Sequence, residues 1–117
     1  MANSFQLHSK QATNGTFDLV PDGTTSIPND AQVVIHALYI SNDNEAAGTT
    51  VDITITDGSN QLKGYILKGV EIPQSSTISL ERPINLPQSS TAAATRKLRI
   101  TADNQLIYGT ASVLVIT

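Results

Sequence analysis

Apolar and polar residues alternate with a period of two along much of this chain, which predicts β-strands with one buried face. Val51, Ile53 and Ile55 are each separated by a single polar residue. The same alternation occurs over residues 77–81 and 97–101. Because successive side chains of a strand point to opposite faces, each segment is expected to bury one face and expose the other.

Two further segments are apolar on both faces. They cover residues 33–40, where His36 interrupts the apolar run, and residues 113–116. A strand that lies in the middle of a covered sheet needs apolar side chains in both directions. Both segments are therefore predicted to be central strands, or strands whose second face is covered by a neighbouring subunit.

Turn signals separate these strands at intervals of roughly ten residues. The clearest are Asn14-Gly15, Pro21-Asp22-Gly23 and Asp57-Gly58-Ser59-Asn60. Residues 88–95 are rich in Ser, Thr and Ala and contain no large apolar side chain, so they predict a loop. The pattern predicts an all-β protein, an antiparallel β-sandwich of about eight strands that is either immunoglobulin-like or jelly-roll-like.

The length of 117 residues suits one domain. Residues 1–14 are polar, and we interpret them as an N-terminal arm or as a first edge strand through Phe5 and Leu7. Residues 15–117 are expected to form a single β-sandwich domain. The first residues lack the basic and apolar regions of a signal peptide, so we expect no export by the general secretory route.

Composition excludes several classes of protein. The net charge of -3 argues against a protein that binds nucleic acid through a basic face. Charged residues make up 15% of the chain, which is low for a helical bundle or a coiled coil. There is no Cys, so disulfides, thiolate metal sites and cysteine nucleophiles are all excluded.

Candidate metal ligands do not form a recognisable motif. His8 and His36 stand 28 positions apart, and that spacing defines no metal site. His36 is expected to be a half-buried residue hydrogen-bonded to the backbone; three copies meeting on a symmetry axis are the alternative. The segment 42–45, Asn-Asp-Asn-Glu, lacks the central Gly and the closing Glu of a calcium loop, so we interpret it as a solvated turn.

Catalytic motifs are equally lacking in the sequence. It has no Gly-x-Ser-x-Gly elbow and no phosphate-binding glycine loop; Gly64 and Gly69 are instead predicted to mark bulges or tight bends. The basic cluster of Arg96, Lys97 and Arg99 is expected to lie on a solvent-facing strand. We therefore predict no enzyme and no catalytic, cofactor-binding or metal site. The carboxylates expected on the wet faces of strands are Asp18, Asp52, Glu71 and Glu81.

Aromatic side chains bear on carbohydrate binding, because sugars stack on exposed rings. The chain has three Tyr, two Phe and no Trp. A carbohydrate-binding module would require an exposed ring, for which Tyr65 and Tyr108 are the candidates.

The order of strands and turns resembles one group of proteins. Residues 33–42, 50–57 and 65–73 are followed by the strand segments 76–80, 84–86, 98–102 and 112–116. This succession, over roughly residues 20–117, resembles small β-sandwich virion proteins of tailed bacteriophages.

The resemblance implies a structural protein of the virion, most simply a capsid decoration (cement) protein that stabilises the head. It further implies assembly in the host cytoplasm, the major capsid protein or other virion proteins as partners, and a homo-oligomer with a trimer favoured. From the composition and motifs we expect no cofactor, no nucleic acid and no membrane as partners. A neck, tail or baseplate component and a small carbohydrate-binding adhesion module are the alternatives.

Overall fold

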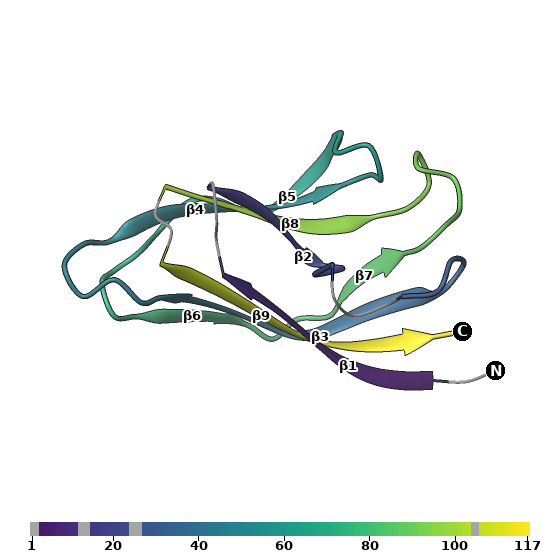
Figure 1. Ribbon diagram of the computed structural model, residues 1–117, viewed down its shortest axis with the longest axis horizontal. Helices are drawn as coiled ribbons and strands as arrows, with labels where there is room; N and C mark the ends of the chain where they lie inside the picture. The colour runs from purple at the N-terminus through teal and green to yellow at the C-terminus, as the bar shows by residue number, and fades with distance from the viewer. Residues whose placement is uncertain (1–2, 12–14, 24–26, 104–105) are drawn as a thin grey trace.

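The computed structural model describes residues 3–11, 15–23, 27–103 and 106–117, and their strands form two facing sheets (Figure 1). No helix that could span a membrane is found among these residues. The strands are β1 (Asn3–Gln11), β2 (Thr16–Val20), β3 (Gln32–Asn42), β4 (Thr49–Thr56), β5 (Leu62–Ile72), β6 (Thr77–Leu80), β7 (Ile84–Pro87), β8 (Lys97–Ala102) and β9 (Ile107–Ile116).

All strand pairs are antiparallel, and they are nested along the chain. β4 pairs with β5, β3 with β6 and β7, β2 with β8, and β1 with β9. One sheet has the order β1-β9-β3-β6, with β7 also on β3, and the other has the order β2-β8-β4-β5. A chain that folds as one long hairpin and wraps across two sheets is a jelly roll.

β6 and β7 occupy a single strand position. β6 pairs with the second half of β3 and β7 with its first half, and residues 81–83 interrupt them. The described part of the sandwich therefore has eight strand positions, in line with the prediction of about eight strands, and the jelly-roll alternative is confirmed. The expectation that residues 33–40 and 113–116 are central strands is also confirmed, because β3 and β9 both have neighbours on each side.

The core lies between the sheets and consists of the inward residues of the alternating strands. Val51 and Ile53 are fully buried, as are Leu98 and Ile100 on the neighbouring strand β8. Gly109 on β9 allows the sheets to approach at one point: a Cβ placed there would lie 2.9 Å from Cδ1 of Ile100. The predicted bulge at Gly69 is confirmed, because its φ is +64° and the β4–β5 register shifts beside it.

His36 lies at a β-bulge in β3, and this corrects the prediction of a half-buried histidine. Ile35 pairs with Val113 and Ala37 with Ser112, so His36 is an extra residue in the β3–β9 register. The bulge turns the His36 side chain to solvent and returns Leu38 to the core.

Residues 88–95 form turns, as predicted, and they are held to the sandwich by hydrogen bonds. The Gln88 side chain donates through Nε2 to the Arg96 carbonyl at 2.9 Å. The Gly58 backbone N–H donates to the Ala92 carbonyl, also at 2.9 Å. The loop thereby packs against the turn between β4 and β5.

Candidate interaction surface

β1 is turned so that its apolar side chains face outward. In the antiparallel register with β9, Phe5 is opposite Leu114, whereas Gln6 is opposite the buried Val113. Side chains opposite one another lie on the same face of a sheet. Phe5 and Leu7 consequently point away from the core and are 78% and 63% exposed.

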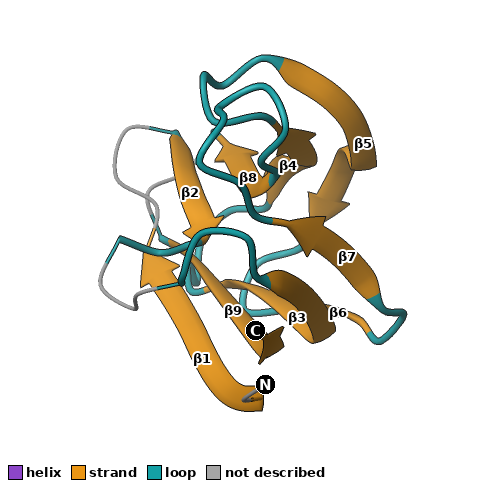
Figure 2. Ribbon diagram, turned by 90° about the vertical axis from the view of Figure 1, so that its right-hand side faces the viewer, coloured by secondary structure: helices purple, strands orange, loops and turns teal. Residues whose placement is uncertain are grey.

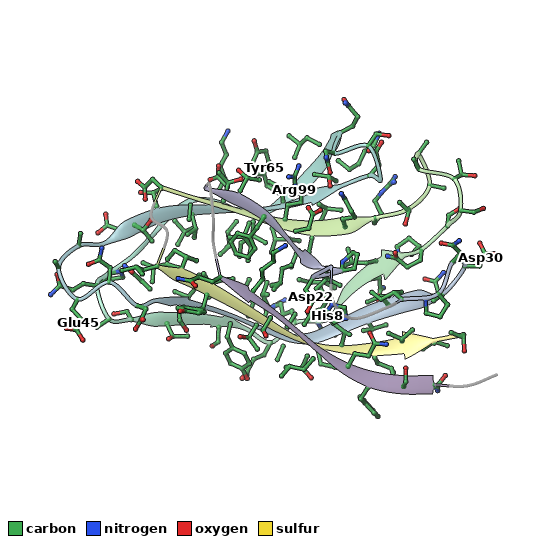
Figure 3. All side chains as sticks on the ribbon, viewed as in Figure 1. His8, Asp22, Asp30, Glu45, Tyr65 and Arg99 are labelled. Carbon is green, nitrogen blue, oxygen red and sulfur yellow. The ribbon has the colours of Figure 1, made fainter. Side chains whose placement is uncertain are left out.

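The inward face of β1 is polar and is held by His8, which is fully buried. Gln6 Oε1 lies 2.9 Å from His8 Nε2. The backbone N–H of Asp22, in the turn after β2, donates to His8 Nδ1 at 3.2 Å. Nδ1 must therefore be the unprotonated nitrogen, so the proton is assigned to Nε2. Figure 3 shows His8 and Asp22 close together beside β1.

Burial lowers the pKa of His8, because charging an imidazole away from water is unfavourable. The Asp22 carboxylate, with Oδ1 3.6 Å from Nδ1, opposes this and raises the pKa by its charge. The same carboxylate accepts a hydrogen bond from the Ser9 backbone N–H at 3.3 Å. A neutral histidine and one aspartate thus fix the orientation of β1.

The outward face of the sheet carries a group of apolar side chains that we call the outer patch. Phe5, Leu114 and Val34 occupy one cross-strand row through β1, β9 and β3. The Phe5 ring centroid lies 6.1 Å from that of exposed His36. The outer patch consists of Phe5, Leu7, Val34, Leu114 and Ile116, of which the last three are half-buried.

A polar hollow of about 550 Å³ lies at one end of the same sheet, beside exposed Tyr108. The buried Asn42 side chain shapes it by donating to the carbonyls of Ala47 and Ile72 at 3.0 and 3.1 Å. Asp43 and Glu45 also line it, and the remaining lining residues are Ser41, Ser75, Ser76 and Thr77. Residues 43–45 follow β3 in a loop, in line with the prediction, whereas Asn42 is the last residue of β3 and is buried rather than solvated.

A second hollow, of about 600 Å³, opens between the two sheets at the break between β6 and β7. Its lining is mostly apolar and includes Ile66 on β5 and Leu80 and Ile84 beside the break.

The candidate charged residues have structural partners. Asp18 Oδ2 lies 3.1 Å from Lys97 Nζ, and Asp18 Oδ1 lies 2.7 Å from Arg99 Nε. Arg96 donates to the carbonyls of Ala93 and Thr95. The expectation of solvent-facing basic side chains is only partly right, because all three are half-buried.

Asp18, Asp52 and Glu71 lie on strands, as expected, whereas Glu81 lies in the break after β6, which corrects the prediction for that residue. Asp52 on β4 accepts a hydrogen bond from the Gly69 N–H at 2.6 Å, and Glu81 lines the hollow beside β6. Glu71 and Asp103 line one small hollow, where the Thr49 hydroxyl donates to Asp103 and lowers the pKa of that carboxyl. Within the described ranges, no group of three His, Cys, Asp or Glu is arranged to hold a metal ion.

The orientation of β1 was not predicted from the sequence, although a signal was present. Phe5 and Leu7 alternate with Gln6 and His8 over residues that we interpreted as a polar arm or as a first edge strand. The alternation indicates a strand, but it does not say which face is buried. A polar inward face becomes possible because Asp22 and Gln6 provide hydrogen-bond partners for His8.

No protein family and no curated protein sequence matches this chain, but solved structures share its fold. The virus-like particle of the extra small virus of the giant freshwater prawn Macrobrachium rosenbergii is 9% identical, with a TM-score of 0.52 over 97% of this chain and 77% of that one. The Tobacco streak virus coat protein is 10% identical, with a TM-score of 0.50 over 98% of this chain and 86% of that one.

The xylan-binding domain CBM22-1 from Paenibacillus barcinonensis Xyn10C is 12% identical, with a TM-score of 0.40 over 97% of this chain and 80% of that domain. A likeness at this level carries no argument about sugar binding. The first two structures, in contrast, place this chain in a defined structural class. It has the jelly-roll β-sandwich fold of viral coat proteins.

Proposed function

We propose that this protein is a non-enzymatic structural component of a virion. The observation that carries the proposal is the outward orientation of β1, which leaves Phe5 78% and Leu7 63% exposed on a sandwich whose fold resembles that of the coat proteins. Exposed apolar side chains that adjoin one another mark surfaces that bind another protein. A jelly roll with such a surface is suited to repeated contacts on a particle.

Within the virion, we propose that the protein is a capsid decoration (cement) protein of a tailed bacteriophage, bound to the major capsid protein. The support is the resemblance in strand order and the outer patch. We also propose a homo-oligomer, and the trimer follows from the resemblance. A neck, tail or baseplate component would have the same surface but a lower copy number.

Copy number in purified particles tests the decoration role. A ratio to the major capsid protein near one, or near a simple fraction, is expected. An amount equivalent to one or a few rings would reject decoration of the head and place the protein in the neck or tail. Absence from the particle would reject the virion role.

Binding of purified protein to particles stripped of it tests the outer patch. The double substitution Phe5→Ser and Leu7→Ser should weaken binding at least tenfold. Leu62→Ser is the matched control, because Leu62 is 51% exposed on β5 of the opposite sheet. Equal binding by both variants would remove the outer patch from the proposal. Point variants are preferable to deletion of residues 2–14, which would also remove β1 and uncover β9.

A second candidate function rests on the polar hollow. Tyr108 is 42% exposed and adjoins hydroxyl and carboxylate side chains, a combination that suits stacking and hydrogen bonding of a sugar. Screening against a glycan array tests it, with Tyr108→Ala expected to abolish binding. Tyr65→Ala is the control, because Tyr65 is 47% exposed on β5 and contacts Lys68. No glycan binding by the native protein would exclude an adhesion module.

A further inference from the structure

We propose that the open edge of β1 binds the β1 of a second copy of this chain, antiparallel and across a two-fold axis centred on Gln6. The proposal does not depend on the virion role. Among the described residues, β1 has one strand neighbour, β9, over its nine residues. Figure 2 shows β1 at the margin of the sandwich, with no strand on its outer side.

The main-chain groups of Phe5 and Leu7 face this open edge. The Ser9 N–H donates to the Asp22 carboxylate, so it is directed away from β9. In an antiparallel pair, the backbone groups of successive residues point alternately toward the partner and away from it. The β1–β9 register has no shift, so Leu7 and Phe5 share the direction of Ser9. An exposed edge of this kind is a template for pairing with another strand.

Asp22 restricts the possible registers. A two-fold axis at Leu7 would pair Phe5 with Ser9 of the second copy. An axis at His8 would pair Leu7 with that Ser9. In both cases the Ser9 N–H, which Asp22 already binds, would be needed within the new ladder. Axes at Phe5 and Gln6 remain. With the axis at Gln6, Ser9 lies opposite Asn3, at the end of the paired segment; with the axis at Phe5, Ser9 lies beyond that end.

The Gln6 axis is favoured by its side chains. It sets Phe5 opposite Leu7 of the second copy in a hydrogen-bonded pair, and Leu7 opposite Phe5 in the symmetric pair. The two outer patches then join into one apolar face. An axis at Phe5 would instead place Leu7 opposite polar Asn3. An interface of this kind is self-complementary, as two-fold symmetry requires.

Charge also favours contact at β1. The chain carries a net charge of -3, so two copies repel one another in general. Residues 3–9 contain no Asp, Glu, Lys or Arg, and burial keeps His8 neutral near pH 7. Two copies can therefore approach along this segment without placing like charges opposite each other.

Cross-linking tests the register directly, because the chain contains no Cys. Gln6→Cys places two thiols opposite each other on the axis, at the Cα separation of about 4.5 Å expected for a non-hydrogen-bonded pair, which suits a disulfide. Ser4→Cys is the matched control on the same face. Its two copies would be offset by about four residues, or roughly 13 Å, along the strands. Mild oxidation of the folded variants should produce a covalent dimer with Gln6→Cys only. Cross-linking with Ser4→Cys to the same extent, or with neither variant, would overturn the proposal.

Sedimentation equilibrium of the Cys-free protein tests the contact itself. The expected mass is twice 12.4 kDa. If the protein also forms trimers, β1 pairs would join two trimers, and the expected mass is that larger multiple. Leu7→Pro removes the N–H at the open edge and spares the side that faces β9, so it should weaken pairing at least tenfold. Phe5→Lys should do the same, whereas Leu62→Lys on β5 should not.

Circular dichroism confirms in each case that the variant is folded. A protein that stays monomeric at all concentrations would overturn the proposal. This holds even if the monomer still binds capsids through the outer patch. An oligomer unaffected by Leu7→Pro would also overturn it, and would place the contact on another surface such as the hollow beside Ile66.

Discussion

His8 and Asp22 are joined by a hydrogen bond in which the Asp22 backbone N–H donates to His8 Nδ1 at 3.2 Å. His8 belongs to β1, and Asp22 follows β2 of the opposite sheet. The contact therefore ties the two sheets together at the edge where β1 is open. It requires a lone pair on Nδ1, so protonation of that nitrogen would break it.

Stability should fall as the pH falls below the ordinary histidine pKa of 6.5. Burial lowers the pKa of His8 in the folded state, so between that pKa and 6.5 the unfolded chain binds a proton that the folded chain does not. Because one site titrates, the unfolding free energy should change by at most about 1.4 kcal/mol per pH unit. Urea unfolding between pH 7.5 and 5 measures it.

His8→Asn provides a variant whose side-chain oxygen can accept from Asp22 without titrating in this range. Its unfolding free energy should vary less with pH than that of the native protein. His36→Asn is the control, because His36 is exposed on the other face of the sheet, and it should retain the native slope. If His36→Asn removed the slope and His8→Asn retained it, the assignment to His8 would be wrong.

Truncation of Leu98 should destabilise the fold far more than truncation of Leu7. Leu98 is fully buried between the sheets, and Leu98→Ala should cost about 2–5 kcal/mol of unfolding free energy. Leu7 is 63% exposed, so Leu7→Ala should change the stability of the monomer by about 0.5 kcal/mol or less. Chemical denaturation at low protein concentration measures both. A large loss with Leu7→Ala would show that β1 packs inward.

Gly109 and Gly64 form a second contrasting pair. A Cβ on Gly109 would lie 2.9 Å from Ile100 and 3.1 Å from Leu19, both in the core, so Gly109→Ala should cost about 1–3 kcal/mol. A Cβ on Gly64 would meet nothing within 4 Å. Gly64→Ala should therefore leave the midpoint of thermal unfolding unchanged or raise it slightly. Equal effects would indicate that the sheets are farther apart near Gly109.

Asp57 should support the turn between β4 and β5. Its Oδ1 accepts hydrogen bonds from the backbone N–H groups of Ser59 and Gln61 at 2.8 and 3.0 Å. The bond from Gln61 is the main cause of its lowered pKa. Asp57→Ala should lower the midpoint of thermal unfolding at pH 7, and Asp57→Asn, which retains an acceptor, should lower it less.

The same carboxylate should contribute to acid unfolding. Its pKa is lowered on folding, so its contribution is present above the ordinary value of 3.8 and is lost as the pH falls through the lower folded value. The difference between native protein and Asp57→Asn should shrink over that range. A difference that stayed constant from pH 5 to pH 2 would contradict this role.

Much of the fold could be predicted because its strands follow a simple rule. Val51 and Ile53 on β4, and Leu98 and Ile100 on β8, alternate without interruption, and all four are buried. His36 shows where the rule ends. The apolar run around it looks continuous, whereas a bulge shifts the alternation by one residue, and a bulge depends on the pairing of two strands far apart in sequence.

The interaction surface was less predictable for a related reason. Alternation in residues 3–11 defines two faces of β1, but their assignment depends on the partners of His8, which are known only once the Asp22 turn has been placed. Asn42 is similar, since a polar side chain in a predicted turn is buried because Ala47 and Ile72 present carbonyls to it. Long-range hydrogen bonds of this kind leave no periodic signal in the sequence.

The nested pairing also governs the order in which the surface can arise during synthesis. Of the strands that the structure describes, β1 comes first and β9 last in sequence, and Asn3 pairs with Ile116. Phe5 therefore has its neighbour Leu114 only after the segment that contains β9 has been synthesised. The outer patch spans this pair, so a chain that is still being made cannot present it complete. Association that requires the complete outer patch must therefore wait until β9 has paired with β1.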